Sequence, residues 1–218
     1  GRTVYDNLKK AILFLLPTNG GQSFTIVAAI LLGLTLPLTP VQVLWVNMVT
    51  AVTLALALAF EPTEQDVMRR PPRPPGTPIL SRFLLWRIAF VSLLLVVGTF
   101  GHFIWVLQHT DDLDLARTVA INTLVVGQVF YLFNSRYIVR SALNWEGFFG
   151  SRAVLIAIGV LVVLQMLFTY APPVQFLFGT AAIGLEEWGR ILLFGVVLLL
   201  LVEAEKAVLR GKGLARHG

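Results

Sequence analysis

The chain has 218 residues, of which 56% are hydrophobic and only 13% are charged. Soluble globular domains carry about 25% charged residues, so this composition excludes a soluble domain, and the apolar excess excludes an intrinsically disordered chain. Lys and Arg outnumber Asp and Glu by 17 to 12, and there is no cysteine. The lack of cysteine excludes disulfides and thiolate metal sites. The basic residues lie in short loops between apolar runs, which indicates a lipid bilayer as their partner and not nucleic acid.

Six apolar runs follow one another along the chain, at residues 8–34, 41–60, 83–107, 117–138, 151–170 and 190–209. Most of them reach the ~20 residues that a helix needs to cross a hydrocarbon core of ~30 Å. A transmembrane β-barrel would show alternating segments of ~10 residues, and solid runs such as VLIAIGVLVVLQML do not alternate. The sequence therefore predicts an all-α membrane protein, with six transmembrane helices in a single domain, 1–218.

Charged residues between the spans predict the orientation. All the Lys and Arg residues except Arg117 and Arg190 fall on one side of the predicted spans. The opposite connections hold an uncharged turn at 37–40, three aspartates within 111–114 and two glutamates at 186–187. Because short basic loops stay in the cytoplasm, both termini are predicted to be cytoplasmic. An even number of spans agrees with that orientation.

The longest cytoplasmic connection, 61–82, contains the string RRPPRPPGTP. Proline stiffens an extended segment and prevents helix formation. The pattern leaves two interpretations open: a stiff spacer whose arginines fix the topology, or a strut on which a soluble partner domain docks.

The first span contains LLPTNGGQS at residues 15–23. Pro17 removes a backbone donor, and the two glycines at 20 and 21 weaken the helix after it, so we expect this helix to be broken near Pro17–Gly21. A broken membrane helix frees backbone groups for an ion site. Asn19 and Gln22 are three residues apart and share a face if the helix resumes. The alternative is a kinked helix whose amides bond to a neighbouring helix.

The second span has a polar stripe at steps of three, formed by Asn47, Thr50 and Thr53. Such stripes commonly hold helices together through interhelical hydrogen bonds. Placed beside a broken first span, the same stripe could complete an oxygen-lined cavity.

The remaining polar residues of the spans do not form a common stripe. Helix-to-helix contacts are the default interpretation for the amides, which are Asn122, Gln128, Asn134 and Gln165. At the end of the last span, Glu203 and Glu205 are predicted to pair with Lys206 and Arg210. The middle of the first five spans holds no Asp or Glu, so no carboxylate metal site is identified. No phosphate-binding loop is present either, and no catalytic residue is assigned in this chain.

Several strings resemble one family. GRTVYDNLKKAI, TNGGQ, PLTPVQVLWVNMVTAVTLALALAFEP and DVMRRPPRPP are similar to the last six membrane helices of P-type ATPases of the calcium- and sodium-pump class. The likeness covers essentially the whole chain. The second-span string with its trailing EP is the most specific, whereas the later spans match in length and topology.

The resemblance implies the membrane half of an ATP-driven cation pump in a bacterial plasma membrane. Its partners would be the first four helices and the cytoplasmic domains of the same pump, together with the transported cation. ATP and Mg²⁺ would act on those cytoplasmic domains, and no cofactor is expected in this chain. By resemblance, the ion-binding positions are Asn19, Gln22, Asn47, Thr50, Ala51 and Gln128. The 61–82 connection would be the coupling loop, with Asp66, Arg69, Arg70, Pro71 and Arg73.

The sequence departs from the calcium pumps of this class at three ion-site positions. Those pumps have carboxylates where this chain has Gln22, Ala51 and Gln128. Neutral oxygens solvate a cation less strongly than carboxylates, so the ion remains open between calcium and a monovalent or other cation. A second hypothesis is a non-catalytic membrane module, either a split-pump subunit or a degenerate remnant. A third, a secondary transporter, predicts a midplane ionisable residue or inverted repeats, and neither is found.

Overall fold

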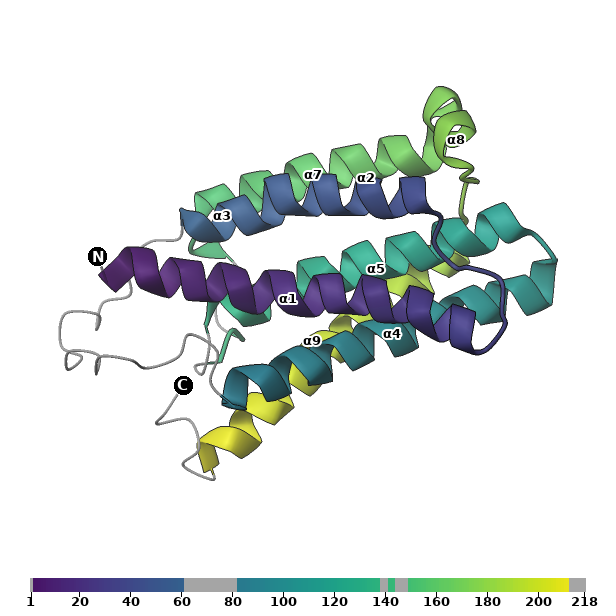
Figure 1. Ribbon diagram of the computed structural model, residues 1–218. Helices are drawn as coiled ribbons and strands as arrows, with labels where there is room; N and C mark the ends of the chain where they lie inside the picture. Colours follow the sequence, from purple (N-terminus) through teal and green to yellow (C-terminus); the bar gives the residue numbers. More distant parts are fainter. Residues whose placement is uncertain (1, 61–81, 138–140, 144–148, 212–218) are drawn as a thin grey trace.

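The computed structural model describes residues 2–60, 82–137, 141–143 and 149–211. These residues form helices and no strand, so the predicted all-α class is confirmed (Figure 1). In chain order, the helices are α1 (Arg2–Leu31), α2 (Pro40–Thr50), the π-helical segment η1 (Ala51–Ala55), α3 (Leu56–Ala59), α4 (Arg82–Thr110), α5 (Leu113–Arg136), α7 (Arg152–Tyr170), α8 (Pro172–Phe178) and α9 (Leu185–Gly211).

Five helical stretches of the described residues are long and apolar enough to cross a membrane: 3–31, 40–59, 82–110, 113–136 and 152–170. They coincide with the first five predicted spans. The sixth predicted span, 190–209, lies within α9, which is 27 residues long but carries Glu203, Glu205 and Lys206 within that span. The count of six spans therefore remains a prediction.

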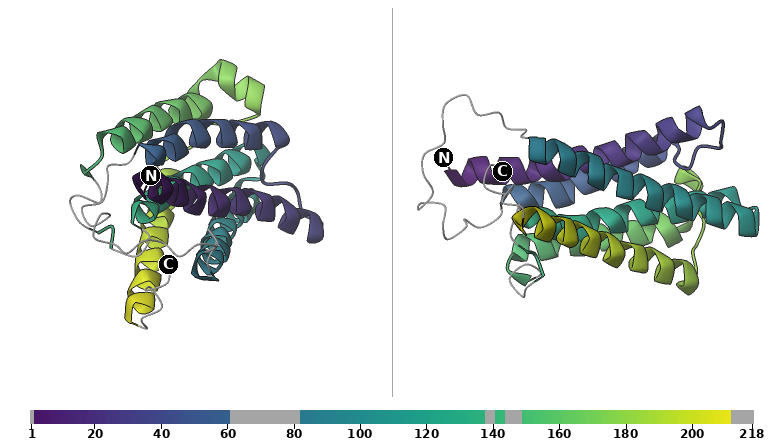
Figure 2. Two further views of the ribbon diagram at one scale, coloured as in Figure 1. Left: turned by 60° about the vertical axis from the view of Figure 1, so that its left-hand side comes forward. Right: turned by 90° about the horizontal axis from the view of Figure 1, so that it is seen from below.

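The long helices run side by side in a bundle (Figures 1 and 2). α5 lies at its centre and packs against α1, α4, α7 and α9, and most of its residues are buried. α2 with α3 lies beside α7 on one side of α5, and α4 lies with α9 on the other. The start of α1 and the end of α9 lie at the same end of the bundle. This arrangement agrees with the predicted orientation, and the cytoplasmic location of that end remains a prediction.

Local sequence signals set the ends of several helices. Thr39 and Gln42 form a capping box at the start of α2, with Pro40 in the first turn, where its missing N–H costs nothing. Beyond α1, Gly33 adopts a left-handed φ of 65°, and Leu34 N–H bonds to the Ala29 carbonyl at 2.9 Å. This glycine-based cap ends the first helix at Leu31, three residues before the predicted end of the span.

The predicted break in the first helix is not present, because α1 continues through Pro17 from Arg2 to Leu31. Pro17 has no N–H for the Leu13 carbonyl one turn earlier. That carbonyl instead accepts a hydrogen bond from the Tyr131 hydroxyl of α5, at 2.8 Å. The two glycines that follow allow α4 to approach: a Cβ at Gly21 would lie only 2.8 Å from Leu95 Cβ. The proline and glycines therefore serve contacts with other helices and do not interrupt this one.

We expect Gly98→Leu to separate α4 from α9 and to lower the free energy of unfolding by about 1–3 kcal/mol, the usual cost of overpacking. A Cβ at Gly98 would lie 2.1 Å from the Phe194 ring, whereas no atom of another described element lies within 4 Å of a Cβ at Gly101. Denaturation of the purified full-length protein by SDS would measure both variants. Gly101→Leu is the matched control and should be neutral or slightly stabilising, because leucine favours helix over glycine. Equal losses in both variants would contradict the expectation.

Candidate ion-binding site

Two glutamine side chains are buried in the bundle without a hydrogen-bond partner among the described residues. Gln22 of α1 is 2% exposed and Gln128 of α5 is 0% exposed. Both the amide oxygen and the amide nitrogen of each side chain are unpaired. Buried polar groups are nearly always paired, and leaving one unpaired costs free energy. The two unpaired amides therefore make this part of the bundle a candidate binding site.

The two glutamines lie at the same depth in the bundle. Leu95 of α4 contacts the backbone of α1 at Gly21, and it also contacts α5 at Gly127, where a Cβ would lie 2.8 Å from Leu95 Cδ2. Each of these glycines immediately precedes one of the glutamines. Leu95 thus packs against both α1 and α5 next to the positions of the two glutamines.

Two other buried amides, Asn122 and Gln165, have partners for both their oxygen and their nitrogen. The Asn122 amide donates to the Thr118 carbonyl at 2.9 Å and to the Thr169 hydroxyl at 3.1 Å. Gln165 donates to Asn122 Oδ1 at 3.1 Å and accepts from Trp45 Nε1 at 3.4 Å. These bonds join α2, α5 and α7, which confirms the interpretation of Asn122 and Gln165 as helix-to-helix contacts. Gln128 differs from them because it has no such bond.

The polar stripe of the second span lies where α2 changes into η1. Thr50 donates its hydroxyl hydrogen to the Val46 carbonyl at 2.7 Å, and Thr53 donates to Val49 at 2.6 Å. Once this hydrogen is engaged, the lone pairs of the hydroxyl oxygen remain free to accept. Asn47 is half-buried on the same helix.

The wider turn of η1 begins at Ala51, directly after Thr50, and Leu56 N–H bonds back to the Ala51 carbonyl. Such π turns are frequent at functional sites, and the spacing of the sequence did not predict this one. The segment also packs against α1. The segment that begins directly after Thr50 is therefore a neighbour of α1.

The structure separates the predicted positions into two groups. Gln22, Thr50 and Gln128 are buried, whereas Asn19 and Ala51 are exposed on α1 and η1. Asn19 and Gln22 are predicted to share a face of the first helix. Gln22 lies on the buried side of that face, and Asn19 lies where the described residues leave the helix exposed. The coupling-loop residues predicted within 61–82 (Asp66, Arg69, Arg70, Pro71 and Arg73) lie outside the described residues.

The buried candidate positions carry neutral oxygens, the amide oxygens of Gln22 and Gln128 and the hydroxyl oxygen of Thr50. No group of three His, Asp or Glu side chains that could hold a metal ion occurs within the described ranges. Calcium sites usually include several carboxylates among six to eight oxygen ligands. The three buried candidate residues, Gln22, Gln128 and Thr50, are uncharged and differ in this from a usual calcium site.

A second polar cluster lies toward the end of the bundle where α9 finishes. Glu203 of α9 accepts hydrogen bonds from Asn134 Nδ2 at 2.7 Å and from the Ser141 hydroxyl at 2.8 Å. Its predicted pairing with Lys206 is confirmed, at 2.8 Å. Glu205 instead pairs with Arg87 of α4. The sequence did not predict this pair, although an arginine inside an apolar run usually pairs with a carboxylate or another polar group.

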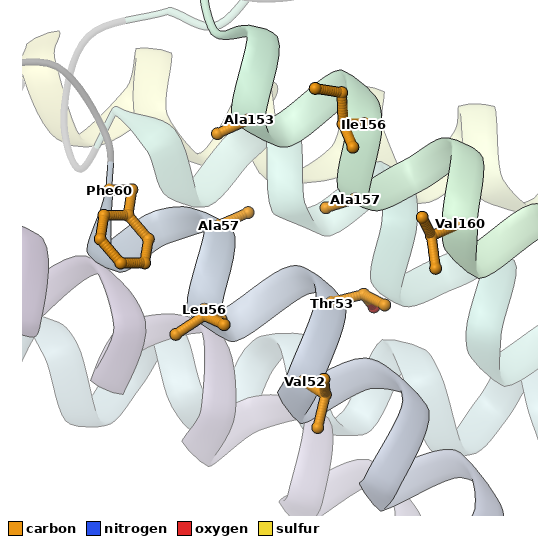
Figure 3. A pocket seen from close by; sticks show the side chains of 9 residues that line it. All are labelled: Val52, Thr53, Leu56, Ala57, Phe60, Ala153, Ile156, Ala157 and Val160. Carbon is orange, nitrogen blue, oxygen red and sulfur yellow. The ribbon is translucent and has the colours of Figure 1, made fainter.

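A shallow groove of about 340 Å³ lies between η1 with α3 on one side and α7 on the other (Figure 3). It is lined by Val52, Thr53, Leu56, Ala57, Phe60, Ala153, Ile156, Ala157 and Val160. Its only side-chain polar atom is the Thr53 hydroxyl, whose hydrogen is bound to Val49. An apolar groove of this kind suits hydrocarbon and does not suit a cation.

Residues 35–208 match the family described as "Cation transporting ATPase, C-terminus". The chain belongs to this family. It is 42% identical over 206 residues to "Probable cation-transporting ATPase F" of Mycobacterium tuberculosis strain H37Rv, a match that covers 94% of this chain and 22% of the relative. It is 42% identical to "Cation-transporting ATPase pma1" of Synechocystis, covering 88% of this chain and 22% of that protein. It is 37% identical to a "Calcium-transporting ATPase" of Bacillus subtilis, covering 86% and 21%.

As a cation-transporting ATPase C-terminal domain, the chain spans about a fifth of the length of these curated relatives. Its long apolar helices make it an integral membrane domain. The bacterial sources of these relatives indicate the bacterial plasma membrane as its location.

Proposed function

We propose that this chain supplies part of the ion-translocation pathway of an ATP-driven cation pump. The observation that carries the proposal is the pair of buried, unpaired amides of Gln22 and Gln128 at one depth of the bundle. Their carbonyl oxygens can replace part of the hydration shell of a cation. The oxygen of Thr50, which directly precedes the η1 segment packed against α1, and Asn47 would extend the same set of neutral ligands.

The remaining four-fifths of the pump would provide what this chain lacks. Phosphorylation by ATP with Mg²⁺ would occur in cytoplasmic domains outside this chain. Helices from that part would cover the open surface at Asn19 and Ala51 and add ligands, including any carboxylate. The connection 61–82 would transmit movements of the phosphorylated domain to α3 and α4, which it joins.

We expect Gln22→Ala and Gln128→Ala in the full-length protein to lower the apparent cation affinity by roughly tenfold each, which is the effect of about 1.4 kcal/mol of lost binding energy. The measurement is the cation dependence of phosphoenzyme formation from ATP, with Ca²⁺, Na⁺ and K⁺ titrated separately. Membrane insertion and expression should be unchanged, since the removed amides make no bond within the described part of the chain.

Gln165→Ala is the matched control, because this amide is bonded to Asn122 and Trp45. It should lower stability without changing the cation dependence. Unchanged dependence in both Gln22→Ala and Gln128→Ala would reduce these residues to packing roles. A wild-type protein that forms no cation-stimulated phosphoenzyme with any of the three ions would favour the non-catalytic module.

A further inference from the structure

A proline in the middle of α1 leaves one backbone carbonyl without its usual hydrogen bond within the helix. Pro17 cannot donate to the carbonyl of Leu13, which would otherwise take part in the helix hydrogen-bond ladder. Leu13 is 1% exposed, so water cannot satisfy this carbonyl from the surface. A helix with such a deficit in its interior normally kinks or breaks, yet α1 is continuous here.

Tyr131 of α5 supplies a hydrogen bond to this carbonyl. Its hydroxyl donates to the Leu13 carbonyl at 2.8 Å, and its ring stacks on Phe14 with centroids 6.1 Å apart and planes 16° apart. Tyr131 and Phe14 are both fully buried. The tyrosine is thus fixed by packing, and its only polar atom points at the one backbone acceptor that the proline leaves unpaired.

A second contact holds α1 on the other side of the proline. The Ser92 hydroxyl of α4 donates to the Pro17 carbonyl at 3.1 Å, and a Cβ at Gly20 would lie 2.4 Å from Ser92 Oγ. α1 is therefore tied to α5 just before the missing bond and to α4 just after it.

These contacts lie next to the candidate ion site. Gln22 follows Pro17 by five residues on α1, and Gln128 precedes Tyr131 by three residues, about one turn, on α5. The hydrogen bond between Tyr131 and Leu13 thus joins the same two helices that carry the two unpaired amides. It fixes their separation and the direction in which α1 leaves the proline.

We propose that Tyr131 is a positioning residue for the ion site: its hydroxyl replaces the backbone hydrogen bond that Pro17 removes and so sets where Gln22 lies relative to Gln128. The role of Tyr131 in transport rests on the proposed function. The hydrogen bond from Tyr131 to the Leu13 carbonyl is independent of that function, so the hydrogen bond and the transport role can be tested separately.

The first test is a double-mutant cycle of thermal unfolding midpoints, measured on the purified full-length protein. Tyr131→Phe removes only the hydroxyl and should lower the midpoint. Pro17→Ala restores an N–H that can bond to the Leu13 carbonyl, so Tyr131→Phe should have little further effect in that background. Additive shifts, with Tyr131→Phe equally costly in both backgrounds, would overturn the inference.

Tyr170→Phe is the matched control. The Tyr170 hydroxyl also bonds to a backbone carbonyl, that of Ile183 at 2.8 Å, and accepts from Trp188 Nε1 at 2.7 Å. Since neither partner belongs to α1 or α5, its loss should shift the midpoint by the same amount with Pro17 or with alanine at that position. Rescue of Tyr170→Phe by Pro17→Ala would also overturn the inference, because it would show that alanine stabilises every variant.

The second test uses Ca²⁺ as the probe and measures Ca²⁺-stimulated ATP hydrolysis by the same proteins. Tyr131→Phe should lower the apparent Ca²⁺ affinity by roughly 3- to 10-fold, with turnover at saturating Ca²⁺ much less affected, and Pro17→Ala should restore the affinity. Unchanged Ca²⁺ dependence together with a lowered midpoint would assign the hydroxyl to stability alone and overturn the positioning role. A wild-type protein without a Ca²⁺ response counts against calcium pumping, whereas the thermal cycle still decides on the hydrogen bond.

Discussion

Arg87→Met is expected to lower the free energy of unfolding by about 3–5 kcal/mol, the usual cost of breaking a buried ion pair by removing one partner. The Arg87 side chain is 0% exposed and that of Glu205 is 10% exposed, and the closest nitrogen and oxygen are 2.5 Å apart. The Arg87 nitrogens form no hydrogen bond within the described residues, so the contact is an ion pair. Removing the arginine leaves a nearly buried carboxylate that has lost its countercharge. SDS denaturation of the purified full-length protein would measure the loss.

Two further variants distinguish a lost charge pair from lost packing. Arg87→Met with Glu205→Met removes both charges and should recover most of the stability, as apolar replacements of buried pairs commonly do. Arg190→Met is the control: its pair with Glu186 is exposed, at 30% and 79%, and should contribute at most about 1 kcal/mol. A double variant as unstable as Arg87→Met would show that the arginine stem, and not its charge, stabilises the contact between α4 and α9.

Glu203→Leu is expected to cost a similar amount, about 3–5 kcal/mol, because this carboxylate is bonded at both oxygens. Oε1 accepts from Asn134 Nδ2 and from Lys206 Nζ. Oε2 accepts from the Ser141 hydroxyl and from Ala142 N–H, at 2.8 and 3.3 Å. Without Glu203, the buried ammonium of Lys206 loses its countercharge and the segment at 141–142 loses its anchor on α9. SDS denaturation of the full-length protein would again be the measurement.

The conservative variant separates the two contributions of Glu203. Glu203→Gln keeps an oxygen acceptor but removes the charge, so its loss should lie between those of wild type and Glu203→Leu. Glu186→Leu, at an exposed position, should change stability by at most about 1 kcal/mol. A loss in Glu203→Leu no larger than in Glu186→Leu would contradict the view that this cluster anchors α9.

Helix boundaries could be predicted closely wherever a local signal exists. Five of the predicted spans coincide with helical stretches because their apolar runs are long, and the capping box at Thr39 and Gln42 is a short-range pattern. The predicted break at Pro17 failed for the opposite reason. A proline's effect on a helix depends on whether another helix satisfies the freed carbonyl, and Tyr131 lies 118 positions from Leu13 in the sequence.

The candidate site shows the same division. Resemblance singled out Gln22 and Gln128, but residue type alone could not distinguish them from Asn122 and Gln165, which are also amides within predicted spans. Only the packed bundle shows that one pair is bonded and the other is not.

The sequence by itself determined the membrane class, the helical fold and the candidate positions, since low charge, long apolar runs and cap residues act over one helix at a time. The tertiary structure alone decided that α1 stays continuous, that Arg87 pairs with Glu205, and that two amides remain unpaired at one depth. Each of these depends on which polar groups of different helices come within hydrogen-bonding distance. The hydrocarbon core of a membrane has no water to bond to a buried polar group. Contacts between helices therefore determine whether such a group holds helices together or remains unpaired.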